Sequence, residues 1–169
     1  EFEPELRIFS EHYPDLITGE IPGMKNLLVK LKSEGFKLYG LSNWCSKVYI
    51  TMDQYDIFKL LDGYIVSSEV HKIKPEPDIY QCLFERFNLK PEECVFADDK
   101  EENVEASIKE GMPAIVFKNA EQFEKKDRKS RKKQIRMMFP PRPESRIKPA
   151  TEIKEQMHSR LMKVLLSRL

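Results

Sequence analysis

Four polar side chains of this sequence together provide the kinds of chemical group that phosphoryl transfer requires. Ser42 supplies a hydroxyl, Lys74 an ammonium, and Asp98 and Asp99 an adjacent pair of carboxylates. Each alone has an ordinary explanation, because turn serines, solvated loop lysines and acids at helix starts are common without any function. Two adjacent carboxylates repel each other, however, and a hard cation such as Mg²⁺ relieves that repulsion. The set therefore points to chemistry that combines a metal ion with a phosphate group.

Apolar runs and helical stripes surround these residues in the chain. Apolar residues at helical spacing over 24–31 are followed by Gly35, which can supply the left-handed turn that closes a helix. Pro77 suits the first turn of another helix, because its missing N–H needs no partner there. The pattern predicts helices over 24–31, 46–54, 77–87 and 101–110, and strands over 36–41, 64–66, 94–97 and 114–117.

Strands that alternate with helices of this length predict an α/β fold, in which a doubly wound parallel sheet has helices on both faces. In such sheets ligands bind outside the carboxyl ends of the strands. Ser42 and Asn43 follow the first predicted strand, and Lys74 lies in the loop after the second. Asp98 and Asp99 follow the third. The topology therefore predicts that a hydroxyl, a lysine and a carboxylate pair meet at one rim of the sheet.

The composition is that of an ordinary globular domain. The length of 169 residues suffices for one hydrophobic core, and no apolar stretch approaches the roughly 20 residues of a membrane span. Three cysteines at irregular spacing match no zinc pattern and favour a reducing compartment, so we expect a cytoplasmic protein. The chain starts with neither an initiator Met nor a secretory signal, which suggests a fragment.

Charge is divided unevenly along the chain. Residues 1–123 carry 14 basic and 23 acidic side chains, whereas residues 124–169 carry 15 basic and 5 acidic ones. We therefore expect an α/β core over 21–123, followed by a basic, proline-containing linker over 124–150 without regular structure. A stripe of apolar residues then predicts an amphipathic C-terminal helix over 151–169.

Three segments carry a resemblance to a known family. They are residues 38–44 (LYGLSNW), 62–77 (DGYIVSSEVHKIKPEP) and 95–107 (VFADDKEENVEAS). In this order they look like the second, third and fourth motifs of haloacid dehalogenase-like (HAD) hydrolases, subfamily IA. The chain resembles that family over roughly residues 6–123, which implies the HAD-like Rossmannoid form of the α/β fold.

The resemblance implies a role for the residues of the second and third motifs. Ser42 would hydrogen-bond the transferring phosphoryl group, and the Asn43 backbone N–H would hold another of its oxygens. Lys74 would offset the negative charge on the nucleophile and the phosphate. These three residues are the expected substrate-binding set, and Ser42 and Lys74 are the expected catalytic residues.

The fourth motif implies a metal site. Asp99 would hold Mg²⁺, Asp98 would assist directly or through water, and Asn103 would support their loop from one helical turn away. The family's remaining protein ligands come from its first motif. We therefore expect this chain to bind Mg²⁺ only weakly.

The first motif of the family, an Asp-x-Asp that supplies the nucleophile and the general acid, has no match in this sequence. In the family its strand lies mid-sheet, between the strands that here end at Ser42 and Ala97. Residues 1–20 resemble only the last helix of the family's cap. We therefore expect the first central strand and most of the helical cap to be absent, two strand edges to stay unpaired and the fold to be marginally stable.

The resemblance implies a hydrolase, most simply a Mg²⁺-dependent phosphatase acting on a small phosphomonoester, a phosphorylated metabolite, through an aspartyl-phosphate. Without the nucleophile, we expect this chain alone to be inactive. Two alternatives stay open: a non-catalytic interaction module built on the same fold, and a metal-free 2-haloacid dehalogenase. Asp99 argues against the dehalogenase, because that chemistry needs no magnesium carboxylate there.

The basic run over 124–136 suits attachment to nucleic acid or to an anionic surface. No aromatic residue interrupts the run to stack on bases, so we do not expect a nucleic-acid partner, although the charge leaves one open. No membrane partner is expected either. The oligomeric state does not follow from the sequence.

Overall fold

The structure is a computed structural model that describes residue 17, residues 19–125 and residues 163–166. Its α-helices are α2 (Met24–Ser33), α3 (Val48–Gln54), α4 (Ser67–Val70), α5 (Pro77–Phe87) and α6 (Glu101–Lys109). Two 3₁₀ helices are η2 (Asp56–Leu60) and η3 (Pro91–Glu93). The strands are β1 (Lys37–Ser42), β2 (Gly63–Val66), β3 (Cys94–Asp98), β4 (Ala114–Val116) and β5 (Lys163–Leu166). A further helical segment spans 120–125.

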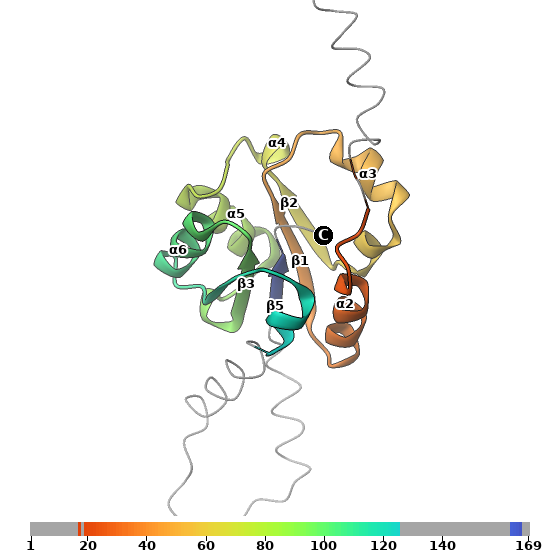
Figure 1. Cartoon of the computed structure of the whole chain (residues 1–169). Helices are drawn as coiled ribbons and strands as arrows, with labels where there is room; N and C mark the ends of the chain where they lie inside the picture. Colours follow the sequence, from red (N-terminus) through yellow and green to blue (C-terminus); the bar gives the residue numbers. More distant parts are fainter. Residues whose placement is uncertain (1–16, 18, 126–162, 167–169) are drawn as a thin grey trace, which may run out of the picture.

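The five strands form one sheet in the order β2-β1-β5-β3-β4, and every neighbouring pair is parallel. Helices α2 and α3 lie on one side of the sheet, and α5 and α6 lie on the other (Figure 1). This arrangement confirms the predicted α/β fold with a doubly wound parallel sheet. Because the strands run in one direction, the carboxyl ends of β1 and β3 lie at the same rim.

Two apolar clusters, one on each face of the sheet, hold the helices in place. Leu28 of α2 packs in the cluster that contains Val95 of β3, whereas Leu83 of α5 packs in the cluster that contains Phe96. Successive residues of a strand point to opposite faces, which is why Val95 and Phe96 join different clusters. All four side chains are at most 1% exposed, so β3 is covered on both faces.

Glycine is required at two points of the core. Gly35 follows α2 with a φ of 88°, a left-handed conformation that side chains disfavour, so it closes the helix as predicted. Gly63 opens β2 beneath the ring of Phe87, and a Cβ there would lie 2.4 Å from Phe87 Cε1. The Phe87 ring itself packs on Tyr39 of β1, with ring centroids 4.7 Å apart. Gly63 therefore allows α5 to approach the sheet.

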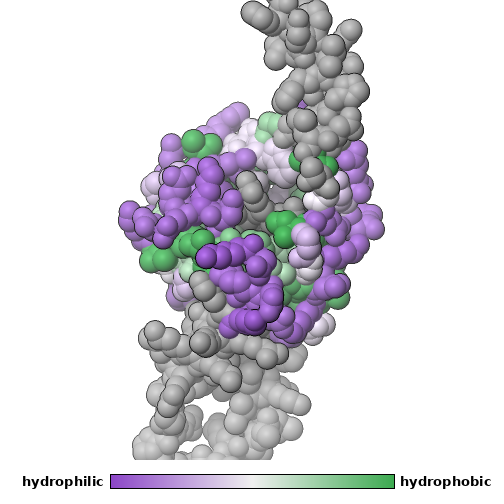
Figure 2. Space-filling view, in the orientation of Figure 1, coloured by the Kyte–Doolittle hydropathy of each residue, from purple (hydrophilic) through white to green (hydrophobic). Residues whose placement is uncertain are grey.

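The surface is largely hydrophilic in the view of Figure 2, where apolar residues occur in separate small areas. The large apolar side chains that are exposed come from different elements: Val29 from α2, Ile50 from α3, Ile73 from the loop before α5, and Ile108 from α6. Among the described residues, no helix has the length and apolar character needed to cross a bilayer.

Strand β5 corrects two expectations from the sequence. An amphipathic helix was expected over 151–169, but Lys163–Leu166 is a strand that pairs with β1 on one side and β3 on the other. The two inner strand edges were expected to be unpaired, and β5 pairs with both. The physical reason is that buried backbone groups need partners, and this demand outweighs the helical periodicity of a short segment.

Other expectations fall outside the described residues. They concern the cap helix within 1–20, of which only residues 17, 19 and 20 are described, the basic linker over 126–150, and the remainder of the segment over 151–169. The roles inferred for those segments stay predictions.

The contact between Gly63 and Phe87 gives a first testable prediction. We expect Gly63→Ala to lower the free energy of unfolding by about 1–3 kcal/mol, because the new methyl group overpacks against the ring. Phe87→Leu removes the ring atoms that the methyl group would meet. In that background Gly63→Ala should cost clearly less, which urea denaturation of the unaltered chain, the two single variants and the double variant would measure. Additive losses in the double variant would contradict the proposed clash.

Candidate functional site

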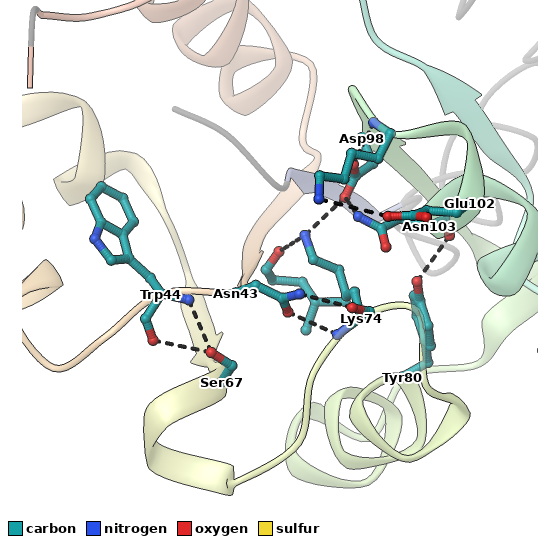
Figure 3. A network of polar contacts seen from close by, with 10 residues as sticks. Asn43, Trp44, Ser67, Lys74, Tyr80, Asp98, Glu102 and Asn103 are labelled. Atoms are coloured by element: carbon teal, nitrogen blue, oxygen red, sulfur yellow. Dashed lines mark hydrogen bonds and ion pairs between the residues drawn. The ribbon is translucent and has the colours of Figure 1, made fainter.

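The candidate site lies at the carboxyl rim of the sheet, where β1 and β3 end. Two segments add to these strand ends: the loop after α4, which carries Lys74, and the start of α6, which carries Asn103. Figure 3 shows Asn43, Lys74, Asp98 and Asn103 turned toward one another in a single polar network. The residues come from distant parts of the chain, so the network exists only in the folded sheet.

Lys74 is at the centre of this network. Its Nζ donates a hydrogen bond to the Leu41 carbonyl oxygen at 2.7 Å and another to Asp98 Oδ2 at 2.8 Å. Lys74 is only 6% exposed and Asp98 only 1% exposed, so the ion pair is buried. The ammonium therefore connects the carboxyl end of β1 with that of β3.

Asn43 fixes the backbone of Lys74. The Asn43 side-chain amide donates to the Lys74 carbonyl oxygen at 2.9 Å, and its Oδ1 accepts from the Lys74 N–H at 2.8 Å. This two-way pair holds the loop against the end of β1. The position of the ammonium is thus set by backbone contacts as well as by its own hydrogen bonds.

Asp98 accepts hydrogen bonds on both carboxylate oxygens. Oδ2 accepts from Lys74 and from Asn103 Nδ2 at 3.0 Å, while Oδ1 accepts from the Lys100 backbone N–H at 2.8 Å. Burial raises the pKa of Asp98, but the Lys74 charge and these hydrogen bonds outweigh burial and hold the pKa below its ordinary value. Burial lowers the pKa of Lys74, and the Asp98 carboxylate opposes that decrease without cancelling it.

Asn103 lies one turn into α6 and is 3% exposed. Its carbonyl oxygen accepts a hydrogen bond from the Tyr80 hydroxyl at 2.9 Å, which links α6 to α5. Its side-chain oxygen Oδ1 is buried and has no hydrogen-bond partner within the described part of the chain. A buried amide oxygen in that state is a suitable ligand for a cation or for a bound water.

Ser42 and Asp99 lie next to the network in the chain. Ser42 is half-buried and stands between Leu41 and Asn43, which both contact Lys74. Its side chain lines a small pocket with Trp44 of the following loop. Asp99 follows Asp98 directly and is exposed. The structure thus brings the predicted residues to one rim, as the topology required, and their chemical roles stay predictions.

Several contacts at the rim were not foreseen from the sequence. The Leu41 carbonyl and the Lys100 N–H are backbone groups, and their hydrogen bonds do not depend on the type of the residue. Ser67 exchanges hydrogen bonds with the Trp44 backbone, accepting from its N–H at 3.0 Å and donating to its carbonyl at 3.1 Å. The signal for Ser67 was its place directly after a strand, where hydroxyl side chains often bond to backbone groups.

The chain matches the haloacid dehalogenase-like hydrolase family over residues 3–117, which is most of its length. Together with the fold and the order of the rim residues, this match shows that the chain belongs to that family of hydrolases. The resemblance inferred from the three motifs is thereby confirmed.

Curated relatives include phosphatases. Flavin mononucleotide hydrolase 1 of Arabidopsis thaliana is 29% identical over 105 residues, covering 62% of this chain and 43% of the relative. The phosphorylated carbohydrates phosphatase of Thermotoga maritima is 31% identical over 114 residues, covering 67% of this chain and 50% of the relative. The chain therefore spans about half or less of the length of these relatives.

Among solved structures, a HAD family enzyme from Bacteroides thetaiotaomicron in complex with magnesium and inorganic phosphate is 27% identical with a TM-score of 0.54. The match covers 60% of this chain and 55% of that one. A HAD phosphatase from Thermococcus onnurineus is 26% identical with a TM-score of 0.57, covering 64% of this chain and 50% of that one.

Removing the Lys74 charge should destabilise the fold strongly. Lys74→Met keeps an apolar side chain of similar length but leaves Asp98 buried without its ammonium, so we expect a loss of about 3–5 kcal/mol in the free energy of unfolding. Lys59→Met is the matched control, because it breaks an ion pair with Asp56 whose side chains are 72% and 67% exposed. That control should cost far less in urea denaturation, because water screens an exposed pair. Equal losses in the two variants would contradict a structural role for the buried pair.

The lowered pKa of Asp98 predicts a dependence of stability on pH. A carboxyl group whose pKa is lower in the folded chain than in the unfolded one stabilises the fold above its unfolded pKa, which is about 3.9 for aspartate. That stabilisation is lost as the pH falls through the folded pKa. Asp98→Asn should therefore flatten the decline of stability below about pH 4. Thermal unfolding between acidic and neutral pH would measure the slope, with the exposed Asp53→Asn as the control.

Proposed function

We propose that the carboxyl rim of this chain is the phosphate- and magnesium-binding part of a phosphatase site for small phosphomonoesters. The observation that carries the proposal is the Lys74 ammonium, which is held at 2.7 Å from the Leu41 carbonyl oxygen and at 2.8 Å from Asp98. An ammonium has three N–H donors, and these two acceptors use two of them. The third is suited to a phosphate oxygen at the carboxyl rim of the sheet.

The neighbouring groups complete an anion site in this proposal. The Ser42 hydroxyl and the Asn43 backbone N–H would hold further phosphate oxygens, because Ser42 is the last residue of β1 and Asn43 follows it. Lys74 would neutralise charge that develops on the transferring group. The phosphatase relatives, which include a flavin mononucleotide hydrolase and a phosphorylated carbohydrates phosphatase, support phosphate esters as the substrate class.

The donor set of the rim fits a hard cation that is held weakly. Asp99 is exposed, Asp98 already accepts three hydrogen bonds, and the Asn103 side-chain oxygen is buried without a partner among the described residues. These are oxygen ligands of the kind that Mg²⁺ prefers, and the bound ion would supply positive charge beside the phosphate. Within the described residues, no three His, Cys, Asp or Glu side chains gather as a metal site of their own. Water would therefore complete the coordination.

Hydrolysis in this proposal passes through an aspartyl-phosphate. The nucleophilic aspartate would belong to an Asp-x-Asp motif, and these 169 residues contain no such motif. What the chain does by itself is bind: Ser42, Asn43 and Lys74 orient the phosphate, and Asp98 holds Lys74 in place. We therefore propose that the isolated chain binds phosphate and Mg²⁺ without turnover.

Binding can be tested separately from turnover. Titration of the chain with MgCl₂ and then with inorganic phosphate should shift the backbone amide resonances of Asp99 and Asn103, and phosphate should bind more tightly once Mg²⁺ is present. Asp99→Ala should weaken Mg²⁺ binding by about tenfold or more. Glu105→Ala, which removes an exposed acid from the neighbouring helix α6, should leave it unchanged. Absence of any shift at the rim would overturn the proposed site.

Turnover is checked with a generic aryl phosphate. We expect no magnesium-dependent hydrolysis by the 169-residue chain, because its groups bind the phosphate but do not attack it. Hydrolysis that survives purification and disappears in Asp99→Ala would show that another residue is the nucleophile, and would contradict this part of the proposal alone.

A further inference from the structure

Strand β5 occupies an unusual place in the chain order. It is the last of the described strands in chain order and yet lies in the middle of the sheet, between β1 and β3. Val164 pairs with Leu38 of β1 and with Val95 of β3, and Leu166 pairs with Gly40 and Ala97. The segment is therefore hydrogen-bonded to a parallel neighbour on each side.

The two halves of the sheet that flank β5 are each built from consecutive segments. Strand β1 is followed by β2, which pairs with it, and β3 is followed by β4, which pairs with it. Strand β5 arrives only after residues 117–162 and joins these two halves. Without β5, the sheet would consist of two separate pairs of strands.

The space between β1 and β3 has the character of a groove for an extended strand. Its walls are the facing backbone edges of these strands, whose side chains are deeply buried: Leu38 and Leu41 are 0% exposed, and Val95 and Ala97 are 1% and 2% exposed. Buried N–H and C=O groups need hydrogen-bond partners, and only another strand supplies a full row of them. At the carboxyl end of the groove, the Lys74 ammonium donates hydrogen bonds to both the Leu41 carbonyl oxygen and the Asp98 carboxylate.

We propose that the space between β1 and β3 is a strand-binding groove, that its ligand is the Lys163–Leu166 segment of the same chain, and that this segment docks and leaves as a unit. The segment has only four paired residues, whereas β1 also pairs with β2 and β3 also pairs with β4. A short segment that comes last in the chain order can open without unpairing β1 from β2 or β3 from β4, which is a local opening of the fold. The long connection over 117–162 keeps the segment near the groove, since closing a longer loop adds little cost.

Docking of this segment also sets the geometry of the rim. Leu41 and Asp98 stand at the ends of the two strands that β5 separates, and Lys74 bonds to both. With one strand between them, β1 and β3 are held about 9–10 Å apart, or two strand spacings. Occupancy of the groove therefore determines whether Lys74 reaches both acceptors at once.

A proline placed in β5 of the full-length chain tests the proposal. Each residue of a strand paired on both sides donates its N–H to one neighbour, and proline has none to donate. We expect Val164→Pro to increase amide exchange by about a hundredfold or more at Leu38–Leu41 and Val95–Ala97, while amides of α5 and α6 stay protected. Val164→Ile, which keeps the N–H and the β-branched side chain, should exchange like the unaltered chain.

A labelled peptide of residues 160–169 provides the second readout. It should bind the Val164→Pro chain, whose groove is vacated, at least about tenfold more tightly than the unaltered chain, and it should restore protection at Leu38–Leu41. Unchanged exchange in Val164→Pro would overturn the groove. Loss of protection throughout α5 and α6 would overturn the separability of the segment, and so would a peptide that binds neither chain.

Discussion

Lys74 brings a positive charge into a part of the fold from which water is excluded, and such a charge is costly unless acceptors surround it. The Leu41 carbonyl and the Asp98 carboxylate are those acceptors, and they belong to strands that are not neighbours in the sheet. Asn43 holds the Lys74 backbone in the position from which both can be reached. The packing of the loop, of β1 and of β3 at this rim therefore depends on one ion pair.

The same pair connects the rim to the helices. Asp98 accepts a hydrogen bond from the Asn103 side chain of α6, and the Asn103 carbonyl oxygen accepts one from the Tyr80 hydroxyl of α5. Tyr80 packs edge-on against Phe96, with ring centroids 5.8 Å apart. This contact connects the series of hydrogen bonds to the apolar cluster that contains Phe96. Lys74, Asp98, Asn103, Tyr80 and Phe96 are all buried. Moving the Lys74 ammonium would therefore disturb the contacts of β3 and of both helices on that face.

The sequence was informative wherever local pattern decides structure. The stripe that includes Leu28, the closing Gly35 and the helix start at Pro77 all depend on residues close in the chain, and the structure has them as predicted. Strand β5 was missed because its conformation is determined by pairing with β1 and β3. These strands lie far away in the sequence, and their pairing outweighs the helical stripe predicted within 151–169. The Leu41 acceptor was missed because every residue has a backbone carbonyl, so residue type does not indicate which one accepts a hydrogen bond.

In the proposed function, the arrangement of charge at the rim makes phosphate and a cation favour each other there. In the structure Asp98 competes with any anion for the Lys74 ammonium, since the two groups are 2.8 Å apart. A cation beside Asp98 and Asp99 would weaken the hold of the carboxylates on Lys74 and leave more of its charge for a phosphate. A phosphate beside Lys74 would in turn attract the cation, and the two effects must be equal because binding linkage is reciprocal. The buried ion pair that stabilises the fold is, on this reasoning, also the element through which the two ligands are coupled.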